Sequence, residues 1–74
     1  MDRLEAELKH LFGADVAEQS KSLNREQILV EADAMPELAD KMMRLKGNPA
    51  SQRQLVQSMT KNRAAALCYW LRVA

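Results

Sequence analysis

The stretch from residue 64 to residue 71 limits the fold most, because it is apolar on almost every side. It reads Ala-Ala-Ala-Leu-Cys-Tyr-Trp-Leu, and only the tyrosine hydroxyl gives it a polar face. A helix with this pattern has to be buried on several sides. Three interpretations are open: an N-terminal helix covers the side that a neighbouring helix leaves free, the stretch docks a partner chain through Tyr69 and Trp70, or the helix lies on a membrane surface.

Length and composition predict a small all-α domain. The chain has 74 residues, with eleven alanines and five methionines against three aromatic residues, two glycines and two prolines. We expect one domain over residues 1–74, built as a small antiparallel helical hairpin or as a three-helix bundle with a short N-terminal helix. Chains this short usually need disulfides, metal or oligomerisation for stability. The single cysteine excludes an internal disulfide, so we expect association with another chain, either a second copy or a different protein.

The first helix is expected over residues 2–12. Gly13 follows it at the position where a left-handed C-cap is favoured. Residues 14–23 carry weaker signals: Ala14, Val16 and Ala17 could continue a weak helix, whereas the polar residues 19–22 favour a connecting segment, which is our interpretation. The apolar stripe of the first helix has helical spacing and consists of Leu4, Leu8, Leu11 and Phe12.

A second helix is expected over residues 25–46. Asn24 and Gln27 have the spacing of a capping box at its start. Pro36 lies in its middle, and proline is tolerated only in the first turn of a helix. Either Asp33 caps a new helix that carries Pro36 in its first turn, or one helix is kinked there. The apolar stripe continues through the proline, so both parts face the same side: Ile28, Ala32, Met35, Leu38, Ala39, Met42 and Leu45.

Gly47-Asn48-Pro49 is the clearest turn signal in the chain. Gly47 suits the position after a helix end, and Pro49 fits the first position of the next helix. A third helix is expected over residues 49–72. Two long amphipathic helices joined by so short a turn predict an antiparallel hairpin.

The near-neutral net charge of +1 hides a strong separation of charge. Residues 1–40 hold all ten acidic and four basic residues, giving −6, whereas residues 41–74 hold seven basic residues and no acid, giving +7. Three interpretations are open: the two halves neutralise each other within the fold, the basic half faces an acidic protein surface, or it binds nucleic acid. Nucleic acid is the least favoured, because the basic residues are spread out. Its main support is a set of side chains that can read bases, at the start of the third helix: Gln52, Arg53, Gln54 and Gln57.

No pattern of catalytic or metal-binding residues occurs in the sequence. His10 is the only imidazole and Cys68 the only thiol, and a lone cysteine in an apolar helix is usually a core residue. We therefore expect no enzymatic activity, no cofactor, no metal and no small-molecule substrate. No stretch is long enough to cross a membrane, and the first residues do not resemble a signal peptide. With an unpaired thiol, these features predict a cytoplasmic protein without membrane insertion.

Two segments resemble a known family. Residues 1–8, Met-Asp-Arg-Leu-Glu-Ala-Glu-Leu, resemble the opening of the small co-chaperone subunits of the type III secretion needle protein. Lys41-Met42-Met43-Arg44 before the Gly47 turn is similar to the second half of that family, as is the helix that follows, which is first glutamine-rich, then alanine-rich and finally aromatic.

The resemblance implies a short cytoplasmic helical hairpin that pairs with a larger tetratricopeptide-like chaperone. Together the two proteins hold the needle subunit soluble before export. Pro36 departs from the family's pattern and favours three or more helices over a simple hairpin. The resemblance places the contact with the larger chaperone on six positions: Met42, Leu45, Leu55, Met59, Ala66 and Trp70.

These observations lead us to expect a small co-chaperone. It would bind and stabilise a helical-repeat chaperone and help keep a type III secretion needle subunit unpolymerised before export. The apolar stripe shields partner surface, and the separated charges set orientation more than affinity. Two alternatives come from other classes: a small DNA-binding transcriptional regulator, whose binding must weaken steeply with salt, and a self-assembling helical adaptor, which forms homo-oligomers without any partner.

Overall fold

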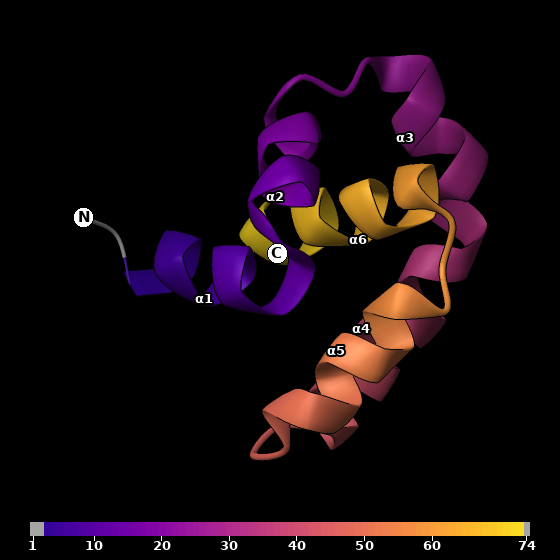
Figure 1. Cartoon of the computed structure of the whole chain (residues 1–74). Coiled ribbons are helices and arrows are strands. Elements are labelled where there is room, and N and C mark those ends of the chain that lie inside the picture. Colours follow the sequence, from indigo (N-terminus) through magenta and orange to yellow (C-terminus); the bar gives the residue numbers. More distant parts are fainter. Residues whose placement is uncertain (1–2, 74) are drawn as a thin grey trace.

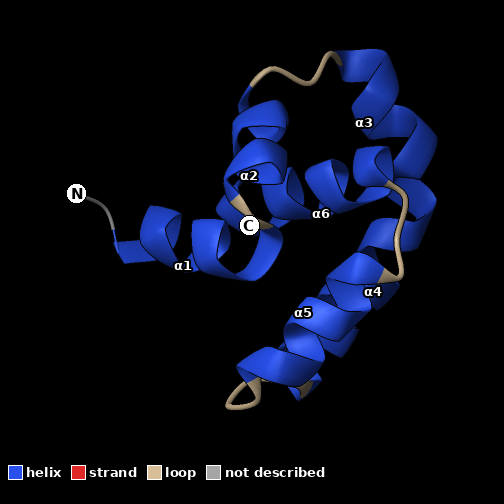
Figure 2. Cartoon of the chain, viewed as in Figure 1, coloured by secondary structure: helices blue, strands red, loops and turns tan. Residues whose placement is uncertain are grey.

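The computed structural model describes residues 3–73 of the chain. That range contains six α-helices, one short 3-10 helix and no strand (Figure 1). Figure 2 shows that only short connections separate the helices. The all-α fold class is therefore confirmed. In chain order the elements are α1 (Arg3–Phe12), α2 (Ala14–Lys21), α3 (Arg25–Glu31), η1 (Ala32–Ala34), α4 (Met35–Arg44), α5 (Pro49–Gln57) and α6 (Lys61–Val73).

The helix α6 lies at the centre of the molecule, with α1, α2, α3 and α4 packed against it (Figure 1). Its residues 64–68 are at most 3% exposed, so the apolar stretch is buried by the chain's own helices. Three of these five residues are alanines, which let neighbouring backbones come close. Tyr69 and Trp70 follow as half-buried side chains. The largest core residues from the other helices are Leu8, Phe12, Met35, Met42 and Val56.

The N-terminal segment contains one helix more than the sequence pattern indicates. α1 ends at Phe12, and Gly13 follows with a φ of 89°. The prediction of an irregular connection over residues 14–23 is wrong, because residues 14–21 form α2. Ala17 and Ser20 are fully buried where α2 packs on α6. Packing on a neighbour therefore stabilises a helix whose own sequence signals are weak.

The predicted helix over residues 25–46 is broken near Pro36. Its start has the expected capping box: Asn24 Oδ1 accepts from the Gln27 backbone N–H at 2.8 Å, and Gln27 Oε1 accepts from the Asn24 N–H at 3.0 Å. The break is the 3-10 turn η1, and Pro36 lies in the first turn of α4, as the first alternative proposed. Asp33 does not cap that helix, because the N-cap residue is Ala34 and no side chain accepts a hydrogen bond there.

The predicted helix over residues 49–72 is two helices. Ser58 Oγ donates to the Leu55 carbonyl at 2.6 Å, and side-chain bonds of this kind compete with the helical backbone pattern. Thr60 Oγ1 then accepts from the Arg63 backbone N–H at 3.2 Å, which starts α6. The polar residues at 58 and 60 therefore end α5 and redirect the chain into the core.

The helices α4 and α5 are joined by the short turn at residues 45–48, as in a hairpin (Figure 1). Gln52 Nε2 donates to the Met42 carbonyl at 3.0 Å and joins the two helices. This pair is only one part of the fold. The described chain has six helices, four of which pack on α6, so the predicted two-helix hairpin or three-helix bundle is not confirmed; α2 and the break before α6 each add an element.

Candidate partner-binding groove

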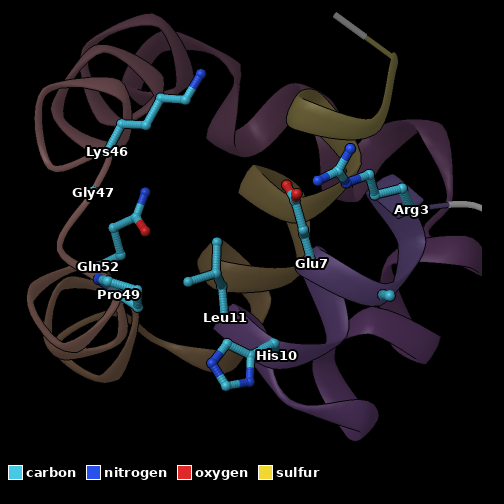
Figure 3. Close-up of a pocket in the computed structure, with 9 residues that line it drawn as sticks. Arg3, Glu7, His10, Leu11, Lys46, Gly47, Pro49 and Gln52 are labelled. Carbon is cyan, nitrogen blue, oxygen red and sulfur yellow. The ribbon is translucent and has the colours of Figure 1, made fainter.

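A groove opens between α1 and the turn that joins α4 to α5. It consists of two adjoining cavities of about 520 and 220 Å³, which share Glu7, Leu11, Lys46 and Gln52. Figure 3 shows the larger cavity, with Arg3, Glu7 and Leu11 on the α1 wall and Lys46, Pro49 and Gln52 facing them.

Local sequence fixes the turn that forms one wall of the groove. Gly47 adopts a φ of 95°, in the left-handed region where residues with a Cβ are strained. Asn48 Oδ1 accepts from the Ser51 N–H at 3.2 Å, and Pro49 occupies the first position of α5. The hydrogen bond from Gln52 to the Met42 carbonyl then holds α5 against α4. The turn wall is therefore fixed by its own residues, whether or not the groove is occupied.

The floor of the smaller cavity is mainly apolar. Leu8 and Met42 are buried beneath it, and Leu11 is half-buried in both cavities. Leu4 and Met43 lie at its edge and are exposed, Met43 to 59%. Exposed apolar side chains that gather around a cavity are typical of a surface that binds another molecule.

The charged residues at the groove are not neutralised within the described part of the chain. Arg3, Glu7 and Lys46 line the larger cavity, and none of them forms an ion pair with a residue of 3–73. Two cations and one anion give the lining a formal charge of +1 with His10 neutral. His10 is exposed at the same cavity (Figure 3).

The structure does not gather the six carried-over positions on one surface. Met42 and Ala66 are 2% and 1% exposed, so they are core residues in this conformation. The apolar stripes that contain them face α6 or belong to it, which explains their burial. Met42 reaches the groove floor. The other four, Leu45, Leu55, Met59 and Trp70, are half-buried and keep some exposed surface.

Sequence reasoning did not identify the groove. Leu4 and Leu11 belong to the stripe of the first helix, which predicted core positions rather than a binding surface. Met43 lies outside the stripe that contains Met42, and a large apolar residue off its stripe is the signal that could have been used. Lys46 carries no such signal, because the side chains facing it come from α1, far away in the sequence.

Part of the charge separation is neutralised within the fold. Arg63 pairs with Glu31 at 2.6 Å and joins α6 to α3. Lys41 and Arg44 pair with Glu37 and Asp40 within α4. Of the seven basic residues after position 40, three form no ion pair in the described part of the chain: Lys46, Arg53 and Lys61.

The Arg72 side chain ties α6 to α1 and α2. Its guanidinium donates to both carboxylate oxygens of Glu5 at 3.1 Å and to Ser20 Oγ at 2.6 Å. Partial burial alone would raise the pKa of Glu5, but the hydrogen bonds from Arg72 and Lys21 outweigh it and lower that pKa. The carboxylate is therefore held in its charged form.

The lone histidine and the lone cysteine lie in different environments. Cys68 is fully buried, where desolvation raises the pKa of its thiol and keeps it neutral. The Arg72 guanidinium lies 4.0 Å from its sulfur, whereas His10 lines the groove. In the described part of the chain, no three His, Cys, Asp or Glu side chains gather where they could hold a metal ion.

The side chains that suggested base reading are divided between two environments. Gln52 is half-buried, bonds to the Met42 carbonyl and lines the groove. Arg53, Gln54 and Gln57 are exposed on α5. None of the helices over residues 3–73 combines the length and hydrophobicity needed to cross a membrane. The chain matches no protein family, no curated protein sequence and no solved structure.

Proposed function

We propose that the protein is a small, non-enzymatic binding module that holds an apolar helical segment of another protein in the groove between α1 and the α4–α5 turn. The observation that carries this proposal is the exposure of Met43 and Leu4 beside a cavity with an apolar floor. A chain this short has few apolar side chains to spare, and leaving two of them at a cavity edge costs stability unless a partner covers them.

The chemistry of the groove indicates what kind of segment fits. Leucine or methionine side chains of an amphipathic helix suit the apolar floor, as in other helix-in-groove complexes. The lining carries a formal charge of +1 from Arg3, Lys46 and Glu7, so acidic residues flanking the apolar face favour binding and orient it.

The co-chaperone role remains our proposal for the biological setting. In that role the protein acts in the cytoplasm, where it binds a helical-repeat chaperone and shields a type III secretion needle subunit before export. It rests on the resemblance of residues 1–8 and 41–44, and the groove supplies a surface suited to the shielding.

The test is affinity capture with three tagged proteins: the wild type, Met43→Asp and Val73→Asp. Met43 and Val73 are similarly exposed, at 59% and 62%, and each lies near the C-terminal end of its helix. The two variants therefore share the unfavourable effect of an acid at a helix C-terminus. We expect a prey protein that the wild type and Val73→Asp retain, and that Met43→Asp retains about tenfold less.

Equal capture by all three proteins would overturn the groove proposal. Mass spectrometry identifies the prey, and a repeat-type chaperone with a small needle-like subunit would support the co-chaperone setting. A Trp70→Ala variant separates the groove from the carried-over positions. If folded Trp70→Ala loses the prey while Met43→Asp retains it, the contact lies at the exposed end of α6 and not in the groove.

A further inference from the structure

A second apolar surface is exposed on α3, away from the groove. Leu29 and Val30 are 58% and 75% exposed, and Val30 is the most exposed of the large apolar residues in the described chain. Glu26 precedes them by one helical turn and Asp33 follows them by one turn, so all four share one face. We call these four residues the α3 patch.

The α3 patch carries unneutralised negative charge. Neither Glu26 nor Asp33 forms an ion pair with any residue of the described chain. The groove has the opposite character, with two cations, Arg3 and Lys46, to one anion, Glu7. Each surface also has exposed or half-buried apolar side chains: Leu29 and Val30 in the patch, and Leu11 with Met43 in the groove.

One copy of the chain cannot bring its own two surfaces together. α3 packs on α6, and the Arg63–Glu31 ion pair of 2.6 Å fixes the end of α3. The groove lies on the other side of α6, between α1 and the α4–α5 turn (Figure 1). A contact between patch and groove therefore requires two copies.

We propose that the α3 patch of one copy binds in the groove of a second copy, with its two carboxylates set against Arg3 and Lys46. The inference rests on the proposed function, since it uses the same groove and names an occupant for it. Patch and groove are different surfaces, so the contact is heterologous and leaves a free patch and a free groove on every pair. Such contacts extend into rings or open chains instead of stopping at a dimer.

This contact competes with the docking of a partner protein. A second copy covers Leu11 and Met43 when the protein is concentrated and unpartnered, and a partner helix displaces it. The partner and the second copy therefore exclude each other from the groove, and assembly falls as partner is added.

The test measures molar mass by light scattering on the full chain from micromolar to millimolar concentration. The wild type is expected to exceed twice the monomer mass of 8.4 kDa as the concentration rises. Val30→Asp replaces the more exposed apolar side chain of the patch, and Lys46→Glu reverses a groove charge. Each variant alone is expected to stay monomeric at concentrations where the wild type assembles. Lys46→Glu sets like charges against each other, whereas Val30→Asp places a charged carboxylate where the contact needs an apolar side chain, and each change weakens the contact by about tenfold or more.

An equimolar mixture of these two variants decides the geometry. The Lys46→Glu chain still has an intact patch and the Val30→Asp chain an intact groove, so the mixture forms one good contact and stops at a dimer. Val73→Asp and Arg53→Glu are the matched controls, since both sites are exposed and outside the patch and groove, and both are expected to assemble like the wild type. Circular dichroism verifies that every variant is folded.

Three results would overturn the inference: a monomeric wild type at millimolar concentration, a mixture that stays monomeric, or assembly that survives both substitutions. The first result leaves the proposed function standing if Met43→Asp still loses its prey. Failure of the proposed function is distinct: the wild type assembles as described here, but Met43→Asp captures the same proteins as the wild type.

Discussion

The two flanks of α1 differ in burial and in the pairing of their charged side chains. On one flank Leu8 and Phe12 are buried, and Glu5 is held by Arg72 and Lys21. On the other flank the charges of Arg3 and Glu7 are unpaired within the described chain, and Leu11 lines an open cavity. One ten-residue helix therefore has a closed flank toward α2 and α6, and a second flank that contacts α5 but also lines the open groove.

The difference follows from the small size of the chain. A domain of 74 residues has only enough apolar surface for one well-packed centre, and α6 takes that place. The helices that touch α6 are closed around it. The helix α5 contacts α1, but a groove stays open between α1 and the α4–α5 turn, and the side chains that line it are not covered by a further helix. That uncovered region is where a partner gains the most by binding.

The largest expected effect tests whether the packed core around α6 contributes more to the free energy of unfolding than the groove does. Leu67→Ala removes a fully buried side chain and is expected to lower the free energy of unfolding by about 3 kcal/mol. Met43→Ala, on the open side, is expected to cost less than about 0.5 kcal/mol. Urea unfolding followed by circular dichroism measures both. Similar losses for the two variants would mean that the groove is as well packed as the core.

The second expected effect tests the polar contacts of the closed flank. Arg72→Ala deletes the hydrogen bonds to Glu5 and Ser20 and the packing of the side chain's stem. We expect a loss of about 2 kcal/mol in the free energy of unfolding. Arg72→Lys should recover little of it, because an ammonium group cannot make the two-pronged contact with the carboxylate.

Arg53→Ala is the control for that measurement. Arg53 is exposed on α5 and has no ion pair in the described chain, so its removal is expected to change the free energy of unfolding by less than about 0.5 kcal/mol. A loss for Arg53→Ala equal to that for Arg72→Ala would show that net charge, and not the contacts across α1, α2 and α6, sets the stability.

The sequence predicts the closed part of the molecule better than the open part. The run from Ala64 to Cys68 is apolar on every face of a helix, so its burial can be predicted without knowing which face meets a neighbour. The cap at Asn24 and the turn at Gly47 are recognisable from a few adjacent residues. The helix α2 was not predicted because its buried residues, Ala17 and Ser20, are small and one of them is polar, so they form no apolar stripe in the sequence. The groove was not predicted because it forms between residues 35 to 49 positions apart, from Leu11–Lys46 to Arg3–Gln52, and local sequence patterns do not show that these residues meet.

The third expected effect compares two glycines, Gly13 after the end of α1 and Gly47 in the α4–α5 turn that forms a wall of the groove. Gly13 and Gly47 have φ values of 89° and 95°, and an added Cβ would meet no atom within 4 Å at either site. Alanine at either position is therefore expected to cost about 1 kcal/mol of stability, from backbone strain alone. Only Gly47→Ala is expected also to reduce capture of the groove's partner, because Gly47 lines the cavity. Equal capture by the two variants would show that the turn wall does not contribute to binding.

The smallest expected effect is the pH dependence of the free energy of unfolding that arises from Glu5 on the closed flank of α1. The hydrogen bonds of Arg72 and Lys21 place the pKa of Glu5 in the folded protein below its ordinary value of 4.5. At pH values between the two, the unfolded chain binds more protons than the folded one, so stability rises with pH. The contribution of Glu5 is therefore fully present above about pH 4.5 and is lost as the pH falls through the folded value. Urea midpoints of the wild type and Glu5→Gln should converge on acidification, and the convergence should be weaker in an Arg72→Ala background. A gap between the two proteins that stays constant down to strongly acidic pH would mean that Glu5 gains nothing from its partners, and that the two flanks of α1 differ in packing alone.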